Sequence, residues 1–144
     1  MSNIKEVLDR KGSSVLMVPG ATSVLDAIGK MSEANIGAIV IQDGDQPTGI
    51  FTERDYLRKI ALEGRASEDT PVSSVMSSPL ITASSGESTR AAMETMTERR
   101  CRHLIIVDND EMVGIVSLGD LVKHLLVEAE AEVEQLSSYI AGSY

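Results

Sequence analysis

The chain has 144 residues, of which 42% are hydrophobic and 24% are charged, with a formal net charge of −9 at pH 7. This is the size and composition of one globular domain, and the acidic balance argues against nucleic acid or an anionic membrane as partner, because both require a basic surface. No apolar run approaches the roughly 18 residues of a membrane span, the first ten residues carry no signal segment, and Cys101 is the single cysteine, so a cytoplasmic protein without disulfides is expected.

Five elements are predicted in the first half of the chain. A Ser or Thr residue directly before apolar residues at helical spacing is typical of the start of a helix, and Thr22 and Ser23 stand at such a place. The run 36–41 is continuously apolar, which is typical of a strand covered on both faces. In chain order the elements are a strand at 15–18, a helix from 22 to 31, strands at 36–41 and 49–51, and a helix that begins at Thr52.

The same order of elements recurs 65 residues further along the chain without an insertion. Met31 matches Met96, and Ile41 matches Ile106. Self-similarity of this kind indicates two copies of one unit. The sequence therefore predicts an α/β (α+β) fold of two tandem β-α-β-β-α repeats packed as a pseudo-twofold dimer. The second copy has a strand at 80–82, a helix from 87 to 96, strands at 104–107 and 114–116, and a helix that begins at Ser117.

The boundaries of the repeats follow from composition. Gly, Ser and Pro residues in the stretch 64–74 are typical of a linker. The last helix continues through alternating Glu and Ala residues, which are strong helix formers, and we expect its end to contact a partner. The predicted organisation is a first repeat at 8–66, a linker at 67–74, a second repeat at 75–130 and a C-terminal helical extension at 131–144.

A short motif marks the start of the last helix in each copy. It reads Gly49-Ile50-Phe51-Thr52-Glu53-Arg54-Asp55 in the first copy and Gly114-Ile115-Val116-Ser117-Leu118-Gly119-Asp120 in the second. A hydroxyl three residues before a carboxylate is a helix capping box, which needs no ligand. The same groups suit a nucleotide, because a carboxylate can accept two ribose hydroxyls and a helix N-terminus can receive a phosphate. The recurrence favours the ligand interpretation, and the two roles can coexist.

This motif, present twice in register, closely resembles that of tandem cystathionine-β-synthase-type (CBS) domains, also called a Bateman module. The resemblance covers about residues 8–130, and the stretches 50–59 and 136–144 look like those of stand-alone CBS-pair proteins of bacteria and plant organelles. It implies a non-catalytic regulatory sensor that binds an adenosine-containing ligand in the cleft between the repeats. It further implies a homodimer that signals to an unidentified protein partner by conformational change.

The candidate ligand-binding residues combine the motif with the resemblance. Arg54 and Arg58 lie four residues apart on one helical face and can clamp a phosphate, whereas Gly119 and Lys123 stand at these positions in the second copy, so unequal affinities are expected. The resemblance implies that a purine slots against the strand before the motif. The candidates are Ile36, Gly37, Ala38, Thr52, Arg54, Asp55 and Arg58 in the first repeat, and Thr82, Arg102, His103, Ser117 and Asp120 in the second.

AMP is the first expectation for the ligand, with ADP, ATP, NAD(H) and S-adenosylmethionine as alternatives. A different class of function is a ligand-independent interaction scaffold that acts through the dimer and the C-terminal helix. A nucleotide-hydrolysing enzyme ranks lower, because no nucleophile–base pair is visible, and we expect no catalytic residue. His103 and His124 are too few to predict a metal site, and Cys101 fits a buried, unreactive thiol.

Overall fold

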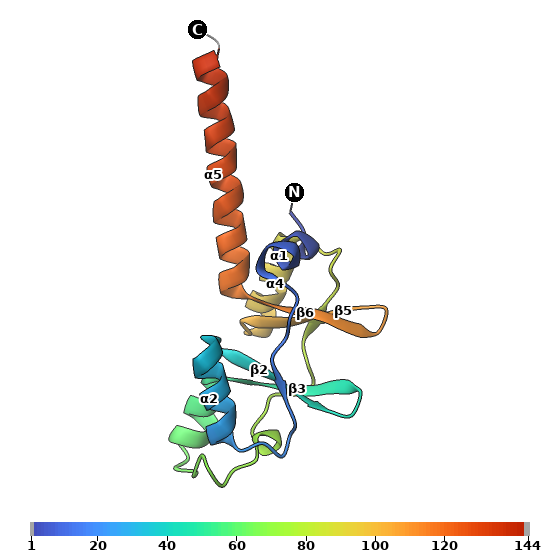
Figure 1. Ribbon diagram of the computed structural model, residues 1–144, viewed down its shortest axis with the longest axis vertical. Helices are drawn as coiled ribbons and strands as arrows, with labels where there is room; N and C mark the ends of the chain where they lie inside the picture. Colours follow the sequence, from blue (N-terminus) through green and yellow to red (C-terminus); the bar gives the residue numbers. More distant parts are fainter. Residues whose placement is uncertain (1, 143–144) are drawn as a thin grey trace. The chain divides into compact units, whose positions relative to one another are not determined.

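The computed structural model describes residues 2–142 and has a mixed α/β architecture with two three-stranded sheets. The chain divides into two compact units. The first unit is Ser14–Thr82, and the second unit combines the N-terminal segment up to Ser13 with the chain from Ala83 onward. The predicted fold class, two repeats of mixed α/β structure with a long C-terminal helix, is confirmed (Figure 1).

The first unit contains a sheet with the strand order β1-β2-β3. Strands β1 and β2 are parallel, and β2 and β3 form an antiparallel hairpin in which Ala38 pairs with Thr52. The last helical stretch begins as α3 and continues as a π-helical segment, in which Leu62 N–H donates to the Leu57 carbonyl five residues earlier. The elements are β1 (Met17–Val18), α2 (Val24–Ala34), β2 (Ala38–Asp43), β3 (Gln46–Thr52), α3 (Glu53–Asp55), the π-helical segment Tyr56–Ala61 and a 3₁₀ turn at Val72–Ser74.

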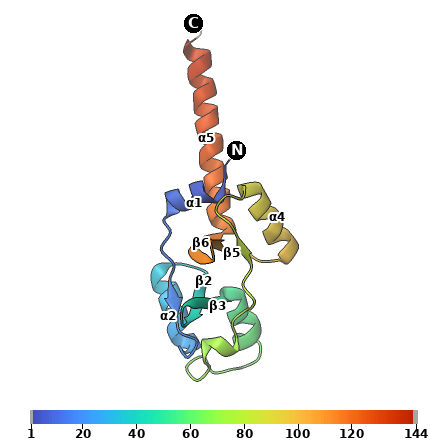
Figure 2. The same ribbon diagram turned by 90° about the vertical axis from the view of Figure 1, so that its right-hand side faces the viewer.

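The second unit repeats this arrangement with the strand order β4-β5-β6 and adds a helix at each end. Helices α1 and α4 both contact the first part of α5, which lies between them, and the rest of α5 extends away from the sheet (Figure 2). Among residues 2–142, no helix combines the length and the apolar character of a membrane span. The elements are α1 (Ile4–Lys11), β4 (Thr82–Ala83), whose first residue is the last of the first unit, α4 (Thr89–Arg99), β5 (His103–Asp108), β6 (Glu111–Ser117) and α5 (Leu118–Gly142).

Equivalent caps define the helix that follows the first strand of each unit. The Ser23 hydroxyl accepts a hydrogen bond from the Asp26 N–H at the start of α2, and the Ser88 hydroxyl accepts one from the Ala91 N–H at the start of α4. Such side-chain caps satisfy N–H groups that have no partner within the helix. The helices were predicted to open at Thr22/Ser23 and at Glu87/Ser88, and Ser23 and Ser88 are the capping residues in the structure.

Each unit is completed by an apolar segment that precedes the other unit in the chain. Helix α1 buries Ile4, Val7 and Leu8 in the second unit, although it lies directly before the first repeat in sequence. The first unit buries Val72 and Val75, which precede the second repeat. The two units thus exchange their first apolar segments.

The exchange changes the domain bounds expected from the sequence. Residues 8–13, assigned to the first repeat, belong to the second unit, and the predicted linker 67–74 contributes Val72 to the core of the first unit. The predicted helical extension 131–144 is, as far as Gly142, the continuation of the last helix that the sequence indicated. The physical reason is that Val72 and Val75 form an apolar pair at helical spacing, which is more stable buried than exposed in a linker.

Gly49 allows the segment 72–77, which includes Val72 and Val75, to lie close to β3. A Cβ atom added at this position would lie 2.5 Å from the Met76 sulfur and 3.0 Å from the Ser77 carbonyl oxygen. We expect Gly49→Ala to lower the free energy of unfolding by about 1–3 kcal/mol, because overpacking forces side chains and backbone to shift. The exposed helix glycine Gly29 has no neighbouring atom within 4 Å, so the matched change Gly29→Ala should raise that free energy by about 0.5–1 kcal/mol. Urea unfolding of both variants checks the opposite signs.

Candidate functional site

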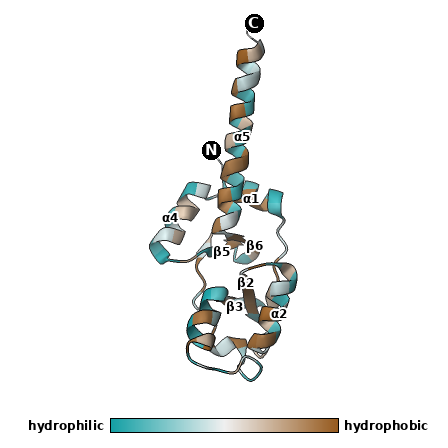
Figure 3. Cartoon of the chain, turned by 90° about the vertical axis from the view of Figure 1, so that its left-hand side faces the viewer, coloured by the Kyte–Doolittle hydropathy of each residue, from teal (hydrophilic) through white to brown (hydrophobic). Residues whose placement is uncertain are grey.

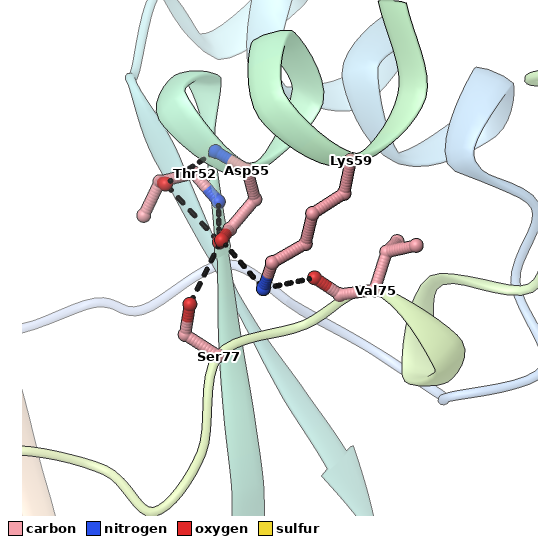
Figure 4. Close-up of polar contacts among 5 residues, drawn as sticks. All are labelled: Thr52, Asp55, Lys59, Val75 and Ser77. Carbon is pink, nitrogen blue, oxygen red and sulfur yellow. Dashed lines mark hydrogen bonds and ion pairs between the residues drawn. The ribbon is translucent and has the colours of Figure 1, made fainter. Parts of the chain in front are cut away.

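The motif of the first unit forms a capping box at the end of β3. The Thr52 N–H and hydroxyl both donate to Asp55 Oδ2, at 3.0 and 3.1 Å, and the Asp55 N–H donates to Thr52 Oγ1 at 3.2 Å (Figure 4). The structural role predicted for this pair is therefore confirmed. It places a carboxylate at the start of a helix, where the local backbone dipoles stabilise negative charge.

The second oxygen of Asp55 also has partners. The Ser77 hydroxyl donates to Oδ1 at 2.8 Å, and the Lys59 ammonium lies 3.0 Å from the same oxygen (Figure 4). Lys59 also donates a hydrogen bond to the Val75 carbonyl at 3.0 Å, so it connects the π-helical segment Tyr56–Ala61 to the segment 72–77. The Asp55 side chain is only 8% exposed. Both carboxylate oxygens are therefore used within the first unit, and a ribose would have to displace these partners.

The second unit contains an equivalent capping box with a different lysine. The Ser117 N–H donates to Asp120 Oδ2 at 2.8 Å, and the Asp120 N–H donates to Ser117 Oγ at 3.0 Å. Lys11, at the end of α1, donates to the same Oδ2 at 2.7 Å and to the Ile115 carbonyl at 2.8 Å. Asp120 keeps 26% of its side chain exposed. This carboxylate is therefore more accessible than Asp55.

The environment of Asp120 acts on its pKa in both directions. Burial is the largest single influence and raises the pKa of this carboxyl, whereas the hydrogen bond and positive charge of Lys11 and the hydrogen bonds of Ser117 lower it. The net result is a lowered pKa. Asp120 is consequently ionised at neutral pH, and its contribution to stability is lost only as the pH falls through this lowered pKa.

A pocket of about 570 Å³ lies in the second unit beside the start of α5. Three of the candidate residues, Arg102, His103 and Ser117, line it, whereas Thr82 and Asp120 are not among its lining residues. Its walls combine apolar side chains of the first turns of α5 with basic groups. The lining residues are Arg102, His103, Ser117, Leu118, Gly119, Val122, Lys123 and Leu126. Lys123, which stands at the position of Arg58 in the second copy, was not among the candidate residues and also lines the pocket.

The ring slot expected in the first repeat is partly filled by protein. A Cβ atom added at Gly37 would lie 2.9 Å from the Glu53 carboxylate, so this side chain covers the glycine. Ala38 is buried within β2, and Ile36 is exposed before that strand. Arg58, the second arginine expected to clamp a phosphate, is exposed on the helical segment. Glu53 is itself exposed, so its flexible side chain can move away from Gly37.

The cysteine is consistent with an unreactive thiol. Cys101 is half-buried, and burial raises its pKa more than the His103 N–H and the Arg99 charge lower it. A raised pKa keeps the thiol protonated at neutral pH, and the protonated form is a poor nucleophile.

The repeat architecture and the two motifs define a known class of protein. The family model of the CBS domain matches residues 4–62 and 72–127. The chain therefore belongs to the CBS-domain family, and members of this family are generally regulatory and not catalytic.

Proteins similar to this chain match nearly all of it. The mitochondrial CBS domain-containing protein CBSX3 of Arabidopsis thaliana is 38% identical over 99% of this chain and 74% of its own length. The CBS domain-containing protein YhcV of Bacillus subtilis is 33% identical over 99% of this chain and 92% of its own length. A solved structure of a protein with CBS domains from Burkholderia ambifaria is 38% identical, with a TM-score of 0.85 over 88% of this chain and 95% of its own.

Proposed function

We propose that the protein is a non-catalytic sensor that binds an adenosine-containing ligand in the pocket of the second unit. The observation that carries this proposal is the pocket of about 570 Å³, which is wide open to solvent and is lined by Arg102, His103 and Ser117 beside the second motif. AMP remains the first choice, with ADP, ATP, NAD(H) and S-adenosylmethionine as alternatives. The stronger site is then in the second repeat, although the sequence placed the fuller arginine clamp in the first.

The groups of the pocket suit the parts of a nucleotide. Leu118, Val122 and Leu126 offer an apolar surface for the purine, and Lys123 and Arg102 offer positive charge for a phosphate. In the first turn of α5, the Leu118 N–H already donates to the Arg102 carbonyl and the Asp120 N–H to Ser117 Oγ, so a phosphate would use the other N–H groups of this turn. For a ribose, Asp120 would have to exchange the hydrogen bond of Lys11 for those of the sugar hydroxyls. Binding would then loosen α1 from β6, and a partner protein would respond to that change.

A second candidate is the interaction scaffold, and two observations favour it. Asp55 already has partners on both carboxylate oxygens within the chain. Several large apolar residues of α5 are also exposed, and Figure 3 colours hydrophobic segments along this helix brown. A scaffold of this kind would pair two copies of the chain or bind another protein through α5. These exposed side chains are Val122, Leu125, Leu126, Val133, Leu136 and Ile140.

The two candidates are separated by ligand-dependent stability. We expect AMP, or another member of a panel of ADP, ATP, NAD⁺, NADH and S-adenosylmethionine, to raise the melting temperature. A ligand at about 100 times its Kd stabilises the folded state by about 2.7 kcal/mol. Lys123→Ala should remove most of this shift, because it deletes a positive charge of the pocket. Arg58→Ala, an exposed change in the first unit, is the matched control and should keep it.

The opposite results have defined meanings. A shift lost in Arg58→Ala and kept in Lys123→Ala would place the ligand in the first repeat and contradict the assignment to this pocket. No shift with any adenosine compound would contradict the sensor and support the scaffold.

A further inference from the structure

His124 is a buried polar side chain whose hydrogen-bonding capacity is not used within the described chain. It lies on the side of α5 that faces α1, it is 3% exposed, and neither ring nitrogen has a hydrogen-bond partner among residues 2–142. A buried imidazole without a partner is costly, so a native structure that keeps one calls for an explanation.

Two glutamates face the same ring nitrogen. The Glu128 carboxylate, one helical turn further along α5, approaches His124 Nε2 to 3.2 Å, and the Glu6 carboxylate of α1 approaches it to 3.8 Å. The Glu128 oxygen is itself buried without a hydrogen-bond partner in the described chain. All three groups have one donor atom within 4.8 Å of the others. The imidazole and the two carboxylates, all of which can bind a metal ion, thus lie close together, and no hydrogen bond joins them within the described chain.

We propose that Glu6, His124 and Glu128 bind a divalent transition-metal ion such as Zn²⁺. Zinc binds imidazole nitrogen at about 2.0–2.1 Å and carboxylate oxygen at about 2.0–2.2 Å, so tetrahedral ligand atoms are about 3.3 Å apart. The separation of 3.2 Å between His124 and Glu128 already matches this value, and that of 3.8 Å to Glu6 is close to it. A mixed nitrogen and oxygen donor set favours such an ion over Mg²⁺, which prefers six oxygen ligands.

The surroundings of the cluster agree with a bound cation. Glu6 is 52% exposed, so its side chain can move the remaining distance toward an ion at low cost and leaves a path from solvent. The net charge of the chain is −9, and the following turns of α5 carry further glutamates, which attract cations. The ion would join α1 to α5 within the second unit. This site is separate from the nucleotide pocket and does not depend on the proposed function.

The test is zinc binding by the full chain without an affinity tag, after treatment with a chelator. Calorimetric titration with ZnCl₂ should give one site per chain, and MgCl₂ at the same concentration should not occupy it. Glu128→Gln and Glu6→Gln should each weaken zinc binding at least about tenfold. Both changes keep the size of the side chain. Glu130→Gln on the same helix, His103→Asn and Cys101→Ser are matched controls and should bind zinc as the unchanged chain does.

A second measurement observes the ligand atom directly. The ring nitrogen signals of His124, recorded by ¹⁵N NMR, should show coordination at Nε2 when ZnCl₂ is added, and this readout remains valid if a glutamate variant alters stability. Absence of zinc binding, or an unchanged affinity in both glutamate variants, would overturn the proposal. So would NMR signals showing that a proton, and not zinc, occupies Nε2 in the presence of the metal, because the ring would then donate a hydrogen bond and could not bind the ion through this nitrogen.

Discussion

Asp55→Ala is expected to lower the free energy of unfolding by about 2–4 kcal/mol. The change removes the acceptor of Thr52 and Ser77 and leaves the Lys59 ammonium without its carboxylate. Breaking one side of a buried ion pair costs about 3–5 kcal/mol, and the value here is reduced because Lys59 is partly exposed. Urea unfolding monitored by circular dichroism measures the loss.

Two aspartate variants serve as controls for this result. Asp120→Ala should cost less, about 1–2 kcal/mol, because the carboxylate is more exposed and its loss resembles the loss of a helix cap. Asp45→Ala, in the exposed hairpin turn, should change the stability by less than about 0.5 kcal/mol. If Asp55→Ala cost no more than Asp45→Ala, the contacts that connect Asp55 to Ser77 and Lys59 would not contribute to the folded state.

Ile4→Ala is expected to lower the free energy of unfolding by about 2–5 kcal/mol, although it lies four residues from the start of the sequence. Ile4 is fully buried in the second unit, and truncation of a buried isoleucine leaves a cavity. Leu62→Ala is the matched control, because that side chain is 82% exposed and should contribute little.

The location of the effect tests the exchange of segments. Hydrogen exchange at the backbone amides of β5 and β6 should speed up in Ile4→Ala, whereas the amides of β2 and β3 should change less. The second unit is affected because α1 packs against β6 and α5. Faster exchange confined to β2 and β3, which belong to the first unit, would contradict the assignment of α1 to the second unit.

The elements with local signals could be predicted from the sequence. Ser23 and Ser88 each start a helix through a hydrogen bond to an N–H three residues later, so the whole signal lies within four residues. The continuous apolar runs 36–41 and 104–107 predicted β2 and β5, because a strand that is buried on both faces has apolar residues at successive positions. The capping boxes of Asp55 and Asp120 were visible in the same way.

The contacts that depend on the tertiary fold could not be predicted. Lys59 is four residues from Asp55, and helical spacing could have indicated that pair. Lys11, however, reaches Asp120 only because α1 packs in the second unit. Glu6 lies close to His124 and Glu128 for the same reason. Glu6 is far from the other two residues in the sequence, so the cluster could not be predicted from it. Helix α1 itself was not predicted.

The exchange of apolar segments limits how the chain can be divided. A fragment that ends at residue 66 lacks Val72 and Val75, and a fragment that begins at residue 75 lacks α1, so neither sequence repeat contains the core of a complete unit. A self-sufficient second unit would require a rearranged gene in which the codon for residue 13 is followed, through a short linker, by that for residue 83. A gene that kept one repeat alone would therefore encode a protein with an incomplete core. We expect selection to keep the two repeats together.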